Sequence, residues 1–148
     1  MPVKGDEGAA IHWDAAYAQG DQTRSWFQQQ PEFSLTLLAH AGVTPDDGVI
    51  DVGGGADRLV DELLARGFAD LTVLDVSEVG LAHARRRLGL RAGRVTWLVA
   101  DLLDWVPDRT YRVWHDRAVF HFMTTESDRH RYLCALEAAT ALGAVAII

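Results

Sequence analysis

Short, mostly apolar runs alternate along the chain with longer segments whose apolar residues recur every three or four positions. Val49–Val52, Leu71–Leu74 and Val95–Val99 are runs of the kind that form buried strands. Residues 58–66 and 79–88 follow the first two runs and place their leucines on one helical face. Strands that alternate with helices in this way predict an α/β protein with a parallel sheet.

The same alternation extends toward both ends of the chain. Further elements are predicted as a helix over residues 33–41, a turn at 45–48, a strand at about 112–115, a helix that starts at Thr125 or Ser127 and closes at Gly143, and a strand at 144–148. Ser77 is the predicted N-cap of the helix over 79–88. The pattern therefore predicts five strands in one sheet.

The N-terminal region divides into a polar segment and an aromatic one. Residues 1–11 are expected to be flexible, and residues 12–148 to form the folded domain. Aromatic residues cluster at 12–17 and 25–28. They predict either a helix that packs its aromatic rings on the sheet or a lid over a ligand.

Composition narrows the class of protein. A chain of 148 residues, 49% of them hydrophobic, suits one domain with a single core. The net charge of -7 argues against nucleic acid as a partner, and no stretch is long and apolar enough to span a membrane. We therefore expect a cytoplasmic protein. Cys134 is the single cysteine, which excludes an intramolecular disulfide, and its apolar neighbours predict a packed thiol.

Three acidic residues follow the first three predicted strands. Asp51 closes the first, Asp75 the second, and Asp101 comes just after the third. The carboxyl ends of parallel strands share one edge of a sheet, so these side chains should line one ligand. The glycines at 53–55 would let that ligand approach bare backbone.

Glycines after a first strand and an acid after the second also occur in nicotinamide dehydrogenases. That fingerprint requires a third small residue where this chain has Arg58, because the helix there packs closely on the strand. It does not require an acid at the position of Asp51. The dehydrogenase interpretation is therefore disfavoured.

The pattern Asp-x-Gly-x-Gly, then an acid after strand two and Ala-Asp after strand three, resembles the class I S-adenosylmethionine-dependent methyltransferases. The likeness extends from about Trp13 to Ile148. It implies a Rossmann-like, doubly wound, mostly parallel sheet in the order 3-2-1-4-5, with an N-terminal helical cap. It also implies S-adenosylmethionine as cofactor and S-adenosylhomocysteine as product.

The resemblance also implies roles for individual residues. By that likeness Asp51 holds the amino group of the cofactor, Asp75 the ribose hydroxyls and Asp101 the adenine amino group. The implied cofactor-binding set is Asp51, Gly53, Gly54, Gly55, Asp75, Val76, Asp101, Leu102, Trp26 and Tyr17. Asp57 stands where many members have glycine, and it is either a ligand contact or, by its position, the N-cap of the next helix.

Methyl transfer is an in-line displacement that needs positioning and exclusion of water, with no metal. A general base is needed only for a protonated nucleophile, and His121 and Asp116 are the candidates. His121 also fits a packed or half-exposed histidine without a catalytic role. His115 is expected to point away, because neighbouring residues on a strand face opposite sides.

The predicted function is methyl transfer to a small-molecule acceptor. A protein-lysine methyltransferase and a truncated, non-catalytic scaffold remain alternatives. Members of this family usually carry two more strands, so residues 144–148 would form an exposed apolar edge. That edge predicts either a homodimer paired through it or further residues after 148.

Overall fold

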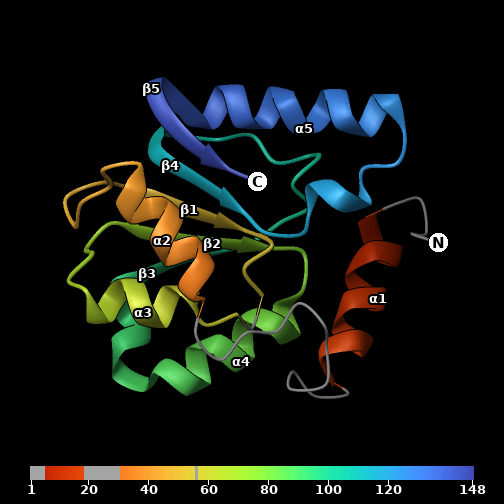
Figure 1. Ribbon diagram of the computed structural model, residues 1–148. Coiled ribbons are helices and arrows are strands. Elements are labelled where there is room, and N and C mark those ends of the chain that lie inside the picture. The colour runs from red at the N-terminus through yellow and green to blue at the C-terminus, as the bar shows by residue number, and fades with distance from the viewer. Residues whose placement is uncertain (1–5, 19–30, 56) are drawn as a thin grey trace.

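A computed structural model describes residues 6–18, 31–55 and 57–148 (Figure 1). Its sheet contains β1 (Val49–Val52), β2 (Leu71–Asp75), β3 (Val95–Val99), β4 (Tyr111–Asp116) and β5 (Thr140–Ile147). The strands follow the order β3-β2-β1-β4-β5, and every neighbouring pair is parallel. The predicted Rossmann-like order is confirmed.

Helices cover both faces of this sheet. The described helices are α1 (Asp6–Ala18), α2 (Glu32–His40), α3 (Leu59–Ala65), α4 (Glu78–Leu88) and α5 (Glu126–Ala139), with short 3₁₀ helices η2 (Gly89–Arg94) and η3 (Phe120–Phe122). In Figure 1, α2 lies in front of the sheet, α3 and α4 lie below it and α5 lies above it. Leu38 of α2 shares one buried cluster with residues of α3 and α4, so these three helices cover the same face. This arrangement makes the sheet doubly wound, as predicted.

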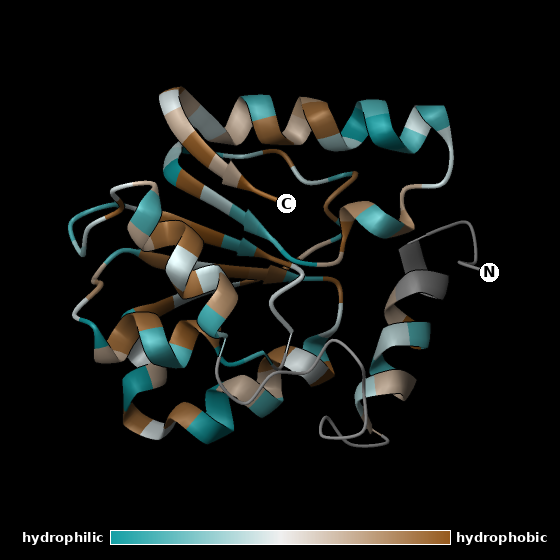
Figure 2. Cartoon of the chain, in the orientation of Figure 1, coloured by the Kyte–Doolittle hydropathy of each residue, from teal (hydrophilic) through white to brown (hydrophobic). Residues whose placement is uncertain are grey.

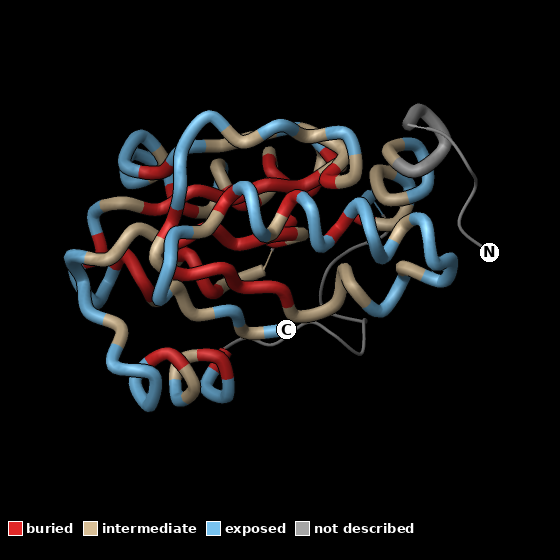
Figure 3. Tube along the Cα trace, turned by 90° about the horizontal axis from the view of Figure 1, so that it is seen from above, coloured by how far each residue is buried: buried red, intermediate tan, exposed pale blue. Residues whose placement is uncertain are grey.

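The central strands form the buried part of the chain (Figure 3), and their side chains alternate between two apolar clusters, one on each face of the sheet. Val49, Val73 and Val113 pack with α2, α3 and α4, whereas Ile50 and Trp114 belong to the cluster on the α5 side. Each such side chain contributes about 2 kcal/mol when fully removed from water. In Figure 2 the strands are mostly coloured as hydrophobic, whereas the helices mix hydrophobic and hydrophilic residues.

The first helix begins earlier than predicted and packs against a different element. α1 starts at Asp6, so residues 6–11 are helical although they were expected to be flexible. It packs against α4 rather than on the sheet. Ser77 joins the two helices, because its Oγ donates to Asp14 and accepts from the backbone N–H of Gly80 at 3.0 Å. The predicted cap at Ser77 is therefore confirmed.

The C-terminal elements differ in their boundaries. Thr125 caps α5, as one of the two predicted starts, but the helix ends at Ala139 and not at Gly143. Thr140 is already extended and pairs with Tyr111, while Gly143, at φ 83°, lies where the β4–β5 register shifts. A β-branched residue favours the strand there, and the glycine supplies the left-handed backbone angle of the irregularity.

Cys134 and the β5 edge bear on two predictions about the surface. Cys134 is exposed, so the predicted packed thiol is wrong. β5 is an edge strand, and Leu142 within it and Ile148 directly after it are exposed. Pairing of this edge with a second molecule stays a prediction. Within the described ranges, no helix has the length and apolarity needed to cross a bilayer.

Candidate functional site

The three acids form a staggered row across the carboxyl ends of β1, β2 and β3. Asp51 pairs with Val73, two residues before Asp75, and Asp75 pairs with Val99, two residues before Asp101. Each acid is therefore displaced from the previous one by about 6.6 Å along the strand direction, at about 3.3 Å per strand residue, and lies one strand further across the sheet. Side chains on a strand alternate between the two faces, so a two-residue offset keeps Asp51 and Asp75 on one face of the sheet. Asp101 continues the same offset beyond the end of β3.

Asp75 is a buried carboxyl group with few compensating contacts. Its Oδ1 accepts from the backbone N–H of Ser77 at 2.8 Å. Burial raises the pKa of Asp75 to about 6, hydrogen bonds from the backbone of Ser77 and Gly55 oppose that rise, and the charges of Asp51 and Asp14 add to it. A ligand that donates hydrogen bonds to this carboxylate would relieve the cost of its burial.

The glycine turn between β1 and α3 is covered from two sides. Gly53 and Gly55 have φ values of 68° and 40°, which favour glycine. A Cβ at Gly53 would lie 2.1 Å from Cγ2 of Val119, and one at Gly55 would lie 2.0 Å from the Tyr17 hydroxyl. α1 and the segment after β4 therefore both reach the turn, and they meet it where only bare backbone fits.

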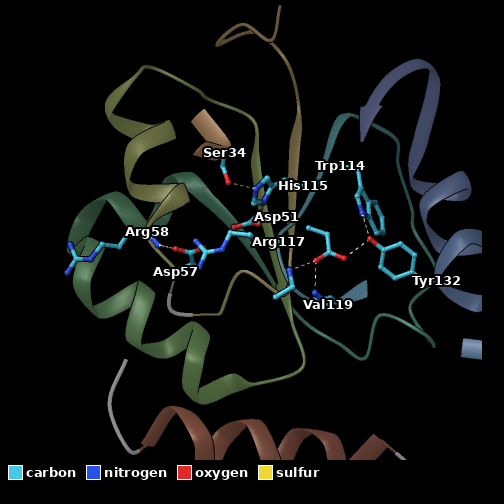
Figure 4. Close-up of polar contacts among 11 residues, drawn as sticks. Ser34, Asp51, Asp57, Arg58, Trp114, His115, Arg117, Val119 and Tyr132 are labelled. Atoms are coloured by element: carbon cyan, nitrogen blue, oxygen red, sulfur yellow. Dashed lines mark hydrogen bonds and ion pairs between the residues drawn. The ribbon is translucent and has the colours of Figure 1, made fainter. Parts of the chain in front are cut away.

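His115 lies beside Asp51 rather than away from the site. Its Nδ1 is 2.7 Å from Oδ1 of Asp51, and its Nε2 is 2.9 Å from Oγ of Ser34 (Figure 4). Burial lowers the pKa of His115, but the charge and hydrogen bond of Asp51, with the charges of Asp57 and Asp116, outweigh it, so the pKa is raised above 6.5. His115 faces the opposite side of the sheet from Asp116, as predicted, but its contact with Asp51 was not predicted.

The missed contact had a signal in the sequence. The order 3-2-1-4-5 makes the first and fourth strands neighbours, and Asp51 pairs with His115 in the register. Paired residues of neighbouring strands point to the same face, so this register brings the two side chains together. The predicted strand order made the two strands neighbours, but it did not fix their register.

Asp57 forms an ion pair and is not the N-cap of α3. The cap position is Arg58, without a capping side-chain hydrogen bond. Oδ1 of Asp57 accepts from the N–H of Arg58 at 2.6 Å, and Oδ2 lies 3.3 Å from the Arg117 guanidinium. Burial and the charge of Asp51 raise the pKa of Asp57, and Arg117 lowers it. Arg117 therefore offsets the additional carboxylate beside the turn.

Asp116 organises the segment that follows β4. Oδ1 accepts from the N–H groups of Ala118 and Val119 at 2.9 and 2.6 Å, and Oδ2 from Phe120 N–H and the Tyr132 hydroxyl at 2.9 and 2.6 Å. The same hydroxyl accepts from Nε1 of Trp114 at 2.9 Å (Figure 4). With four donors around it, this buried carboxylate fixes Val119 above the glycine turn.

We predict that Tyr132→Phe lowers the free energy of unfolding by about 1–3 kcal/mol, because it leaves a buried carboxylate oxygen and a buried indole N–H with fewer partners. Burial, followed by the charge of Asp116, raises the pKa of the Tyr132 hydroxyl, so the group stays a donor throughout the usual range. Urea unfolding measures the change. Tyr111→Phe, whose ring packs on Arg109, is the matched control; an equal loss in both variants would contradict the prediction.

The remaining predicted residues lie around this centre. Oδ1 of Asp101 accepts from Leu103 N–H at 2.9 Å, and Leu102 is buried in the cluster on the α5 side. Val76 is half-buried directly after β2. His121 is exposed in η3, and its ring contacts Phe122 edge to face at 5.6 Å. Trp26 lies outside the described residues.

An aromatic group connects α1 with η3. The rings of Trp13 and Phe122 meet edge to face at 5.2 Å, and Trp13 also contacts Tyr17 at 6.3 Å. Tyr17 reaches Gly55, so the group extends from the glycine turn to His121 and Phe122. The N-terminal helix thus places aromatic faces beside the segment that Asp116 organises.

A parallel sheet in this order, with acids on successive strand ends beside a glycine turn, defines the class I S-adenosylmethionine-dependent methyltransferase fold. A family profile described as "Methyltransferase domain" matches residues 49–142, more than half of the chain. The chain therefore belongs to this methyltransferase family, as its sequence resemblance indicated.

Individual relatives agree with that membership. The eEF1A lysine and N-terminal methyltransferase of Mus musculus is 26% identical over 123 residues, which cover 82% of this chain and 17% of the relative. A DhpI-SAM-HEP complex superposes with a TM-score of 0.71 at 20% identity, covering 99% of this chain and 66% of that one. The glycopeptide N-methyltransferase MtfA with sinefungin gives 0.67 at 19%, covering 80% and 53%. The chain spans less than a fifth of the curated relative's length.

Proposed function

We propose that this chain transfers a methyl group from S-adenosylmethionine to an amine nitrogen of a small-molecule acceptor. The family match supports methyl transfer, and the staggered row of Asp51, Asp75 and Asp101 is the observation that carries the cofactor assignment. Two of the relatives are named for methylation at nitrogen. Their acceptors, a glycopeptide and a protein, differ in size.

The residues at the strand ends suit this cofactor chemically. Asp75 is a buried carboxylate, and hydrogen bonds donated by the ribose hydroxyls would compensate for its burial. Asp51 offers a carboxylate to the ammonium group, and the glycines keep side chains away from the amino-acid portion. When bound, the cofactor supplies a methyl group on a positively charged sulfur, which is a good leaving group.

The protein's own contribution is positioning. Asp116 holds Val119 and Phe120, so we assign it to shaping the acceptor side rather than to proton abstraction, because its oxygens already accept four hydrogen bonds. His121 remains the candidate base, on the exposed η3 helix. An amine is the favoured nucleophile, because a hydroxyl needs a stronger base to reach the same reactivity.

The aromatic group also favours an amine. Phe122 contacts both Trp13 and His121 edge to face, and aromatic faces attract cationic groups. An acceptor that arrives as an ammonium ion would be held there before it loses its proton.

A methyl-transfer assay tests the proposal. Radiolabelled S-adenosylmethionine is incubated with matched acceptors that carry an amine, a hydroxyl or a carboxylate on the same small scaffold, and with a lysine peptide. Label is expected on the small amines, and His121→Asn should reduce the rate most at a pH where the amine is still protonated while an imidazole base is neutral and can accept its proton. Label on the hydroxyl acceptors alone would refute the amine assignment.

A protein-lysine acceptor is the second candidate, and the likeness to the eEF1A methyltransferase favours it. Label on the peptide but not on small amines would select it. Binding of S-adenosylhomocysteine with no transfer to any acceptor would instead select the non-catalytic alternative.

A further inference from the structure

Hydrogen bonds connect three buried side chains behind the glycine turn, one each from α2, β4 and β1. Ser34, His115 and Asp51 are 3%, 1% and 5% exposed. Their hydrogen bonds, at 2.9 and 2.7 Å, run from Ser34 Oγ through both ring nitrogens of His115 to Asp51 Oδ1. The order matches that of a hydrolytic triad, but Ser34 is packed between the helix and the sheet and offers no side to a substrate. A nucleophilic role is therefore excluded.

The partners of His115 suit both of its charge states. Asp51 only accepts hydrogen bonds when ionised, so Nδ1 keeps its proton toward Asp51 whether the ring is charged or neutral. A hydroxyl can accept from Nε2–H in the charged ring or donate to a bare Nε2 in the neutral ring. Ser34 therefore lets a fully buried histidine gain or lose a proton without leaving a buried polar atom unsatisfied.

The two carboxylate oxygens of Asp51 face different partners, one the His115 ring and the other the glycine turn. Oδ1 contacts His115, whereas Oδ2 would lie 2.7 Å from a Cβ placed on Gly54. The histidine thus holds the carboxylate in the orientation that points Oδ2 at the turn (Figure 4). A charged ring and an ionised carboxylate together carry no net charge, and they attract an ammonium group less than the carboxylate beside a neutral ring does.

We propose that His115 is a positioning residue that titrates with cofactor binding: the ring loses its Nε2 proton to solvent when an ammonium group binds to Oδ2 of Asp51. This inference rests on the proposed role of Asp51 toward the cofactor's amino group. Other charges near the ring are the carboxylates of Asp57 and Asp116, and Arg117 offsets Asp57. The charged ring is favoured in the free protein and disfavoured in the complex.

The sign of the pH dependence follows from this exchange. Because the complex holds one proton fewer, affinity rises as pH increases through the pKa of His115, by up to about tenfold per pH unit below it. Asp75 contributes in the same direction near pH 6. We therefore compare the wild type with a His115 variant through the ratio of their dissociation constants at each pH. Both proteins contain Asp75 and bind the same ligand, so the titrations of Asp75 and of the ligand cancel in this ratio.

Calorimetry with S-adenosylhomocysteine between pH 5.5 and 8.5 tests the proposal in the wild type and His115→Asn. Asparagine still donates to Asp51 but cannot be protonated, so its profile should be flatter and the ratio of the two constants should change with pH. Ser34→Ala removes the acceptor of the charged ring and should move the inflection to lower pH. His130→Asn, the same change at an exposed histidine, should reproduce the wild type.

Nitrogen-15 NMR of the wild-type histidine rings gives a second measurement that needs no variant to fold. Near its pKa, the His115 signals should move from the charged ring to the neutral Nδ1–H form when S-adenosylhomocysteine is added. Parallel pH profiles in wild type and His115→Asn, or a ring that stays charged in the complex, would overturn the inference alone. Absence of any binding by the wild type would instead overturn the cofactor assignment itself.

Discussion

Asp75→Asn is expected to weaken binding of S-adenosylhomocysteine at least about hundredfold, because two hydrogen bonds to a charged carboxylate are each worth about 1.5–3 kcal/mol. The same change should stabilise the free protein at pH 8. The pKa of Asp75 is raised from 3.8 to about 6, so the folded state resists ionisation of this buried group. Asparagine removes the charge and keeps an oxygen that can accept from Ser77 N–H.

The pH dependence of this stabilisation has a defined sign. A raised pKa contributes stability that is fully present below pH 3.8 and is lost as pH rises through about 6. The advantage of Asp75→Asn should therefore be absent at pH 4 and reach the order of 1–3 kcal/mol at pH 8. Urea unfolding at both pH values measures it.

Asp46→Asn, at an exposed turn position, is the matched control for Asp75→Asn. It should change neither binding nor stability appreciably. Unaltered affinity in Asp75→Asn would refute the ribose role of this residue. A loss of stability at pH 8 would show instead that the carboxylate is well compensated in the free protein.

Local signals in the sequence predicted the framework of the fold. Apolar runs located the strands, and Ser77 and Thr125 marked helix starts because a hydroxyl there accepts the first unpaired N–H groups. Gly67 lies just after α3 with φ 89°, a left-handed backbone angle that glycine commonly supplies after a helix end. Such features depend on a few neighbouring residues, so they can be recognised without tertiary structure.

Contacts between distant segments could not be predicted in the same way. The ion pair of Asp57 with Arg117 depends on how the turn after β1 meets the segment after β4. The four donors around Asp116 include Tyr132 from α5, and nothing near Asp116 in the sequence identifies that partner. Candidate acids were found, but whether each one binds a ligand or orders a loop depends on these long-range contacts.

At Gly143 a local signal gave a wrong prediction of where a helix ends. A glycine after an apolar helical stripe predicts a helix end, yet α5 ends at Ala139 because Thr140 pairs with Tyr111 of β4. Strand pairing is a long-range interaction that outweighed the local signal. The positive φ of Gly143 was needed, but within the strand.

Gly54→Ala is expected to abolish detectable cofactor binding while the fold is kept. Gly54 is not among the glycines with positive φ, so alanine does not strain the backbone. Its Cβ, however, would lie 2.6 Å from Cγ1 of Val73 and 2.7 Å from Oδ2 of Asp51. The carboxylate must turn away, which removes the oxygen that faces the glycine turn and disturbs the hydrogen bond to His115 at 2.7 Å.

Gly93→Ala is the matched control, because Gly93 also lacks a positive φ and its Cβ would meet no atom within 4 Å. Calorimetry with S-adenosylhomocysteine should give wild-type affinity for Gly93→Ala and no measurable heat for Gly54→Ala, with both proteins folded by circular dichroism. Since only the position of Oδ2 of Asp51 and the packing of Val73 separate the two variants, equal binding in both would mean that the cofactor does not use this carboxylate.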